Sequence, residues 1–210
     1  MPGTIICYGD SNTFGYDPCG TIAGRYPKDV RWTGILDAHV DQDVLNCGEC
    51  GREIPHTDSQ IAFFLKQLES WRSLQAPVQL WIMLGSNDLI QIPRAAAEDV
   101  AARMEAFLRQ VLDTDAVRSG DISLTLISPP LFQYGEWVPK EWMYRESRRI
   151  EGVYRLLAER LSIGFISAGA RELPVVFDGV HLSEEGHRLL AEQLIKETGL
   201  PPAPGNASSE

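Results

Sequence analysis

Short apolar runs that alternate with longer helical segments constrain the fold of this sequence most. Each run stays apolar almost throughout, which is typical of strands that are covered on both faces. We therefore predict one α/β/α domain, residues 1–199, in which a five-stranded parallel sheet lies between two helical layers, as in flavodoxin-like folds. The expected strands are 4–8, 44–47, 78–84, 122–127 and 164–167, and the expected helices are 32–40, 61–74, 93–112, 140–161 and 183–198.

The charge of the chain narrows the choice of partners. Its 19 basic and 29 acidic residues give a formal net charge of -10, whereas nucleic acids and anionic lipids attract positive surfaces. We expect neither a nucleic acid nor a membrane as a partner. The sequence has no run of 18 apolar residues and no signal-peptide pattern, so the expected location is the cytoplasm. Residues 200–210, which lack core-forming side chains, are expected to form a disordered tail.

Two of the four cysteines, Cys47 and Cys50, have a C-x-x-C spacing. This spacing occurs in redox pairs and in zinc sites. A zinc site would need two more ligands at a matching spacing, which the sequence does not offer. The flanking glycines indicate a loop, so we expect unpaired loop thiols and no metal or organic cofactor, with a redox pair as the alternative.

Two segments carry the residue types of a nucleophile and its base. Ser11 follows the first expected strand directly, after Gly9-Asp10, at the strand's carboxyl end. In parallel α/β sheets this edge holds the site. Asp178 and His181 form a D-x-x-H pattern before the last helix, and this spacing lets the carboxylate reach one imidazole nitrogen. Each segment alone is equally typical of a helix cap or a surface turn.

Two further segments supply hydrogen-bond donors for a developing negative charge. Asn87 follows the third expected strand in Gly85-Ser86-Asn87-Asp88, and a carboxamide donates without titrating. The loop after the second strand contains Gly48 and Gly51, and either glycine allows a backbone N–H to approach a substrate closely.

These four segments, in this order, resemble the SGNH hydrolases, the GDSL-type esterase and lipase superfamily. The resemblance implies Ser11 as nucleophile, Asp178 and His181 as its partners, and oxyanion donors at Ser11, Asn87 and Gly51, with Gly48 as the competing glycine. Asn12 stands where the family motif has leucine. Residues 29–34, together with Ser128-Pro129-Pro130, are similar to bacterial arylesterases with acyltransferase activity. That similarity implies short-chain acyl esters and a tendency to form homo-oligomers.

The connection from Pro129 to Tyr144 is unusually aromatic. Its rings are expected to wall a substrate pocket, to form a subunit contact, where Trp and Tyr are enriched, or simply to pack in the interior. The remaining histidines have no carboxylate at a comparable spacing and are expected at the surface or in packing. The candidate pocket residues are Asn12, Trp32, Phe132 and Trp137, and the remaining histidines are His39, His56 and His187.

Together these features predict a serine esterase that hydrolyses small carboxylic esters through an acyl-enzyme, with acyl transfer to alcohols as a second outcome. A carbohydrate O-acetyl esterase and a thioesterase use the same chemistry and remain alternatives. A flavodoxin-like binding module without catalysis would need a phosphate-binding loop, and neither the G-x-x-x-x-G-K nor the G-x-G-x-x-G pattern is present.

Overall fold

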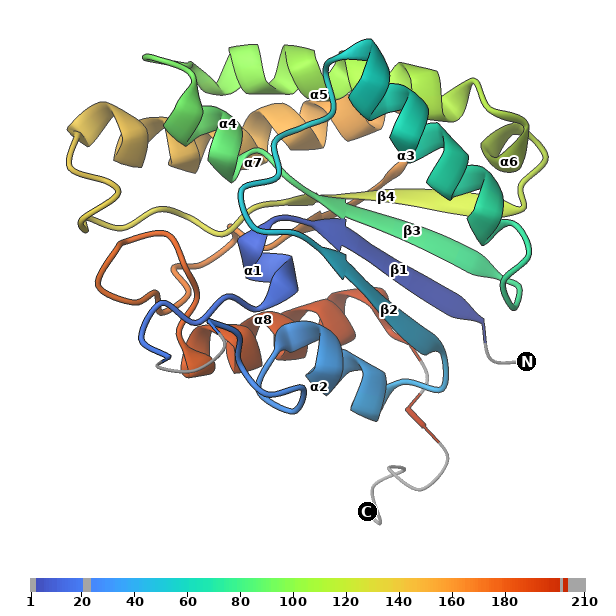
Figure 1. The fold of residues 1–210 in the computed structure, drawn as a ribbon, viewed down its shortest axis with the longest axis horizontal. Helices are drawn as coiled ribbons and strands as arrows, with labels where there is room; N and C mark the ends of the chain where they lie inside the picture. The colour runs from blue at the N-terminus through green and yellow to red at the C-terminus, as the bar shows by residue number, and fades with distance from the viewer. Residues whose placement is uncertain (1–2, 21–23, 201, 204–210) are drawn as a thin grey trace.

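The structure is a computed structural model and describes residues 3–20, 24–200 and 202–203. Five parallel strands form one sheet in the order β2-β1-β3-β4-β5. Helices cover both faces, so the predicted three-layer α/β/α fold is confirmed (Figure 1). The strands are β1 (Thr4–Gly9), β2 (Asp43–Gly48), β3 (Val78–Met83), β4 (Ile122–Ser128) and β5 (Gly164–Ser167).

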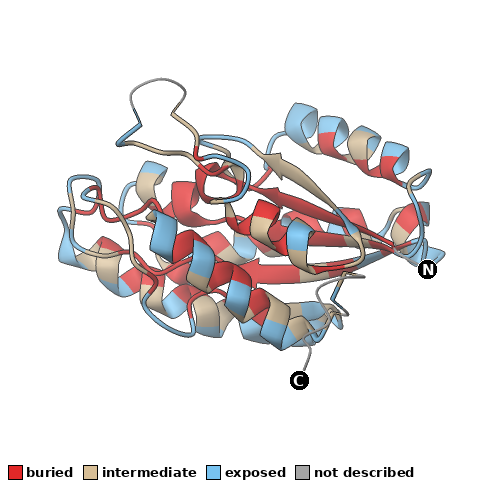
Figure 2. Cartoon of the chain, turned by 90° about the horizontal axis from the view of Figure 1, so that it is seen from below, coloured by how far each residue is buried: buried red, intermediate tan, exposed pale blue. Residues whose placement is uncertain are grey.

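The two faces of the sheet bury separate apolar clusters. Ile6 and Tyr8 of β1 face one cluster, and Ile5 and Cys7 face the other, as the period of two along a strand requires. The strands are mostly buried, while the outer faces of the helices are exposed (Figure 2). The first cluster packs against α3 (Asp58–Trp71), α5 (Ala97–Leu112) and α7 (Glu141–Leu161), and the second against α2 (Trp32–His39) and α8 (Glu184–Thr198).

Helix boundaries differ from the expected ones where capping decides them. Helix α3 begins three residues early because Thr57 and Gln60 form a capping box. The expected helix at 93–112 begins only at Ala97, since Arg94 adopts a left-handed conformation at φ 57°. Three short helices, α1 (Ser11–Phe14), α4 (Ser86–Gln91) and α6 (Asp115–Arg118), were not predicted.

The predicted tail is described only in part. Residues 201 and 204–210 lie outside the described residues. Pro202 forms an antiparallel bridge with Val40, and the Ala203 N–H donates to the His39 carbonyl at 2.7 Å. In the described part of the chain, no helix has both the length and the apolar character that a membrane span requires.

Candidate active site

Ser11 lies where β1 turns into α1, at the carboxyl edge of the sheet. A Cβ on Gly9 would come within 2.0 Å of the Thr13 side chain, so this turn requires glycine. The Asp10 carboxylate accepts the Asn12 N–H at 2.9 Å and caps α1. The turn holds Ser11 almost entirely buried.

His181 and Asp178 form a buried pair on the loop before α8. The imidazole Nδ1 lies 2.6 Å from Asp178 Oδ2, and Oδ1 accepts the N–H groups of Val180 and His181 at 2.9 and 3.0 Å. Burial acts to raise the pKa of Asp178, but these hydrogen bonds outweigh it and lower the pKa. The ionised carboxylate can only accept, so Nδ1 carries the proton and Nε2 is left as an acceptor.

The structure brings Ser11 against this pair. Ser11 Oγ lies 2.9 Å from His181 Nε2, although the two residues are 170 positions apart in the sequence. The hydroxyl donates to Nε2, which completes a hydrogen-bonded series from serine through imidazole to carboxylate. A hydroxyl with an acceptor at this distance can transfer its proton as it becomes a nucleophile.

Two contacts fix the loop that carries His181. The Asn12 side chain donates to the Val180 carbonyl at 3.1 Å and accepts the Leu182 N–H at 2.9 Å, on either side of the imidazole. The loop also packs against the connection that precedes α7. The Trp137 N–H donates to the Asp178 carbonyl at 3.0 Å.

The predicted pocket residues lie in different surroundings: three of them are buried, and the fourth, Trp137, is exposed. Asn12 is buried with both amide atoms bonded to the backbone. Trp32 is buried under α1 and donates its indole N–H to the Asn12 carbonyl at 3.0 Å. Phe132 belongs to the main core cluster, and its backbone N–H donates to the Ser147 hydroxyl at 3.1 Å.

Of the four predicted pocket residues, Trp137 is the one whose side chain is exposed and lies beside His181. It is 45% exposed, and its ring centroid lies 5.0 Å from that of His181. The Tyr16 ring lies 4.8 Å from the same imidazole and was missed by sequence reasoning. Tyr16 belongs to an irregular segment with no motif that would have identified it.

The two candidate glycines have different geometries: Gly48 is the last residue of β2, and Gly51 lies in the loop that follows. The Gly48 N–H is already donated to the Asn46 side chain at 3.0 Å, and a Cβ there would come within 2.1 Å of the Phe14 backbone. Gly48 therefore permits close packing of the strand end against α1. Gly51 adopts φ 76°, and neither its N–H nor that of Ser11 donates a hydrogen bond to any residue that the structure describes.

Asn87 lies in the first turn of α4, beside the same loop. Its Nδ2 donates to the Arg52 carbonyl at 3.0 Å, which leaves a second hydrogen on the same nitrogen. The neighbouring Asp88 is fully buried, and its carboxylate accepts the Ile54 N–H at 3.1 Å and an Arg103 N–H at 2.9 Å. Asp88 and Arg103 thus anchor the helix that carries Asn87.

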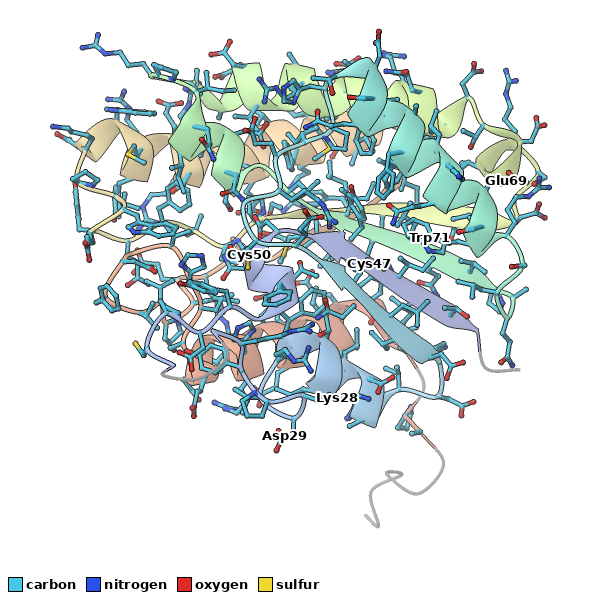
Figure 3. All side chains as sticks on the ribbon, in the orientation of Figure 1. Lys28, Asp29, Cys47, Cys50, Glu69 and Trp71 are labelled. Carbon is cyan, nitrogen blue, oxygen red and sulfur yellow. The ribbon has the colours of Figure 1, made fainter. Side chains whose placement is uncertain are left out.

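The C-x-x-C cysteines lie at and just beyond the end of β2 (Figure 3). Both thiols are free. Burial raises the pKa of Cys47 and of Cys50, so both stay protonated and weakly reactive at neutral pH. Within residues 3–20, 24–200 and 202–203, no group of three or more His, Cys, Asp or Glu side chains is arranged to hold a metal ion.

The other three histidines make no hydrogen bond to Ser11 in the part of the chain that the structure describes. His56 is exposed and His39 half-buried. His187 is fully buried in α8, where its Nδ1 accepts the Trp32 N–H at 3.4 Å. All three positions agree with the predicted surface and packing roles.

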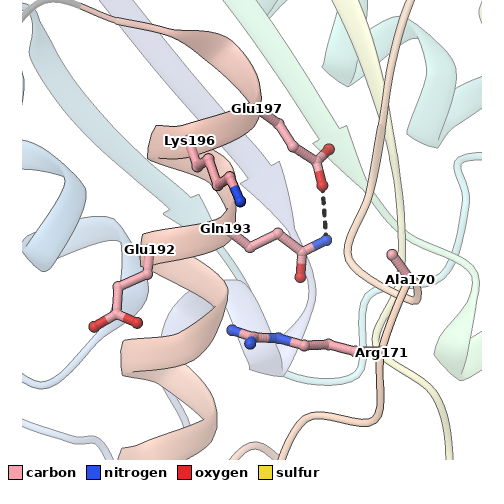
Figure 4. A pocket seen from close by; sticks show the side chains of 6 residues that line it. All are labelled: Ala170, Arg171, Glu192, Gln193, Lys196 and Glu197. Carbon is pink, nitrogen blue, oxygen red and sulfur yellow. Dashed lines mark hydrogen bonds between the residues drawn. The ribbon is translucent and has the colours of Figure 1, made fainter.

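A hollow of about 490 Å³ lies between α8 and the loop after β5 (Figure 4). It is lined by charged side chains and by Gln193, whose amide donates to Glu197 at 2.9 Å. Gln193 lies nine residues beyond the start of α8, roughly 14 Å along the helix axis from the His181 end. None of the predicted site residues lines this hollow.

Comparison with known proteins adds independent findings. Residues 7–189 match the model of the GDSL-like lipase/acylhydrolase family. The native aryl esterase of M. smegmatis superposes with a TM-score of 0.77 at 25% identity, covering 94% of this chain and 98% of that one. A carbohydrate acetylesterase family member from Sinorhizobium meliloti superposes with a TM-score of 0.77 at 27% identity, covering 94% and 97%. No curated protein matches the sequence significantly.

Proposed function

Because the chain belongs to the GDSL-like lipase/acylhydrolase family, we propose that it is a serine esterase acting on small esters with short acyl or aryl groups. The observation that carries this proposal is the 2.9 Å contact between Ser11 Oγ and His181 Nε2. In the proposed reaction, His181 takes the hydroxyl proton as the oxygen attacks the ester carbon. Asp178 keeps the imidazole in the required tautomer and stabilises the imidazolium.

The ester carbonyl oxygen becomes an oxyanion in this step, and three N–H donors are assigned to it. They are the backbone N–H groups of Ser11 and Gly51 and the second Nδ2 hydrogen of Asn87. Gly51 is chosen over Gly48 because the Gly48 N–H is already hydrogen-bonded. His181 then returns the proton to the leaving alcohol, and water or a second alcohol resolves the acyl-enzyme.

The rings beside His181 support esters with a flat or apolar group. Tyr16 and Trp137 both contact the imidazole edge-on, so a substrate carbonyl that reaches Ser11 has an aromatic side chain close by. Flat apolar groups pack favourably against such rings. The similarity to the M. smegmatis aryl esterase agrees with this choice.

A carbohydrate O-acetyl esterase is the second candidate, and the similarity to the S. meliloti carbohydrate acetylesterase family member favours it. The proposed chemistry is identical, so the substrate alone separates the two activities. Comparing kcat/KM for p-nitrophenyl acetate with that for acetylated xylose decides between them. A preference for the sugar ester assigns the second candidate.

The mechanism is tested with the Ser11→Ala variant. We expect hydrolysis of p-nitrophenyl acetate to fall by at least about 10³-fold, because the attacking oxygen is gone. Ser123→Ala, a serine on β4 whose hydroxyl bonds to Val78, is the matched control and should keep full activity. A fluorophosphonate probe should label Ser11 of the wild-type protein, as read by peptide mass spectrometry. Full activity of Ser11→Ala, or labelling elsewhere, contradicts the proposal.

A further inference from the structure

Arg52 follows the proposed oxyanion glycine, but its side chain turns inward towards the strand ends and is only 14% exposed. Its Nη1 donates to the Gly9 carbonyl at 2.7 Å and also to the Cys47 carbonyl. One guanidinium nitrogen therefore joins the last residue of β1 to the end of β2. Gly9 immediately precedes the Asp10-Ser11 turn.

Two further contacts hold the guanidinium in this position. Its carbon lies 4.1 Å from the centroid of the Tyr8 ring, a cation–π distance. Its Nη2 pairs with the Glu49 carboxylate at 2.7 Å, and Glu49 opens the turn that leads to Gly51. Because the Glu49 side chain is 70% exposed, this ion pair contributes little by itself, and the bonds to the two carbonyls matter more.

The backbone of Arg52 makes the third connection. Its carbonyl accepts the Asn87 Nδ2–H at 3.0 Å, which orients the carboxamide. Its N–H donates to the Glu49 carbonyl at 3.3 Å and closes the turn around Gly51. Arg52 thus contacts or adjoins the segments that carry all three proposed oxyanion donors.

We infer that Arg52 is the positioning residue of the oxyanion hole: it fixes the Gly51 turn and Asn87 relative to the Ser11 turn. This inference rests on the proposed esterase function. The role requires the planar fork of arginine, since a lysine ammonium is a point charge that cannot reproduce the fixed geometry of the guanidinium. A misplacement of about 1 Å at a catalytic site costs roughly 10²-fold in rate.

The test compares Arg52→Lys and Arg52→Gln with the wild type. We expect kcat for p-nitrophenyl acetate to fall about 10-fold to 100-fold while KM changes by less than about 3-fold, because transition-state stabilisation is lost and ground-state binding is kept. An arylboronic acid, which forms a tetrahedral adduct with the serine, should bind weaker by a similar factor. Arg72→Gln, an ion-paired arginine at the end of α3, is the matched control and should leave both values unchanged.

Active-site titration separates positioning from simple destabilisation. Stoichiometric fluorophosphonate labelling counts the folded sites, so kcat per labelled site falls only if the site geometry has changed. The loss in the Arg52→Lys, Asn87→Ala double variant should be smaller than the product of the single losses, because both act through one hole. Arg52→Lys retains the charge and serves where Arg52→Gln does not fold.

The outcomes distinguish this inference from the function on which it rests. A wild-type protein that hydrolyses no ester and leaves Ser11 unlabelled overturns the esterase function itself. An active wild type whose Arg52 variants keep kcat per labelled site, or whose losses multiply with that of Asn87→Ala, overturns only the positioning role.

Discussion

At the scale of single residues, the proposed oxyanion hole depends on one side-chain donor. Asn87 uses one Nδ2 hydrogen for the Arg52 carbonyl, and the second hydrogen is the one that we assign to the oxyanion. We predict that Asn87→Ala lowers kcat by about 10²-fold to 10³-fold with a small effect on KM, as is typical when one such donor is removed. Steady-state kinetics with p-nitrophenyl acetate measures both constants.

A second substitution at Asn87 sharpens this prediction. Asn87→Asp keeps the shape of the side chain but places a carboxylate beside the Arg52 carbonyl and the developing negative charge. We expect it to lower kcat more than Asn87→Ala does. If the aspartate variant is the more active one, Asn87 does not face the oxyanion.

At the scale of elements, Asn12 connects α1 to the loop that carries His181. Replacing it by leucine, the family-motif residue, would leave the Val180 carbonyl and the Leu182 N–H buried without these partners. An unsatisfied buried backbone group costs about 1–3 kcal/mol. We predict that Asn12→Leu lowers the free energy of unfolding by a few kcal/mol and also lowers kcat, because His181 sits between the two freed groups.

Urea unfolding and steady-state kinetics measure the two effects of Asn12→Leu separately. Thr57→Ala, which removes the N-terminal cap of α3 and a hydroxyl that bonds to Ser59 and Gln60, is a suitable control. It should lower stability by about 1 kcal/mol and leave kcat unchanged. A leucine variant that keeps wild-type stability and kcat contradicts the connecting role of Asn12.

Ser11 was identified from its sequence pattern, whereas the contacts of Asn12 were not. This difference indicates which features of this fold a sequence can predict. Ser11 lies in a short pattern directly after β1, and Asp178 and His181 lie in a short pattern just before α8; parallel strands bring the strand ends and the loops that follow them to one edge. Strand bounds were predicted within two residues for the same reason, since burial on both faces leaves a local apolar pattern. Local sequence patterns are therefore sufficient to predict the sheet and the edge of the sheet at which the candidate site lies.

The pocket walls depend instead on how distant segments pack. Trp32, Phe132 and Trp137 are equally aromatic in the sequence, yet only Trp137 is exposed beside the imidazole. The contacts of Arg52 are likewise made to the ends of two strands and to α4, and no spacing along the chain encodes them. Tertiary packing decides both cases.

At the scale of the whole molecule, two buried groups make opposite contributions to the pH dependence of stability. Burial raises the pKa of Asp10 to about 6, from 3.8. Between these values the folded chain binds the proton more tightly than the unfolded chain, so the fold gains stability as the pH falls. Burial, with the nearby charges of Arg31 and His181, lowers the pKa of His187 to about 3, from 6.5. The unfolded chain then binds the proton more tightly, so the fold loses stability as the pH falls below 6.5.

The two variants Asp10→Asn and His187→Asn should separate these contributions. One pKa unit corresponds to about 1.4 kcal/mol. Raising the pH from 4 to 8 should therefore stabilise Asp10→Asn relative to wild type by about 2 kcal/mol. His187→Asn keeps a short side-chain acceptor for the Trp32 N–H and, relative to wild type, should become more stable by about 2 kcal/mol between pH 7 and pH 5. Urea unfolding at each pH gives both differences, with Asp29→Asn as the exposed control.

Because the two differences have opposite signs, they can be told apart from a general effect of acid on the fold. Between pH 4 and pH 6, the stabilising contribution of Asp10 and the destabilising contribution of His187 partly cancel in the wild type, which should show a shallow profile there. Removing Asp10 should make the wild-type loss of stability on acidification steeper. Removing His187 should turn that loss into a gain of stability, or abolish it. Parallel profiles for all three proteins would show that neither group is held in its buried, shifted state.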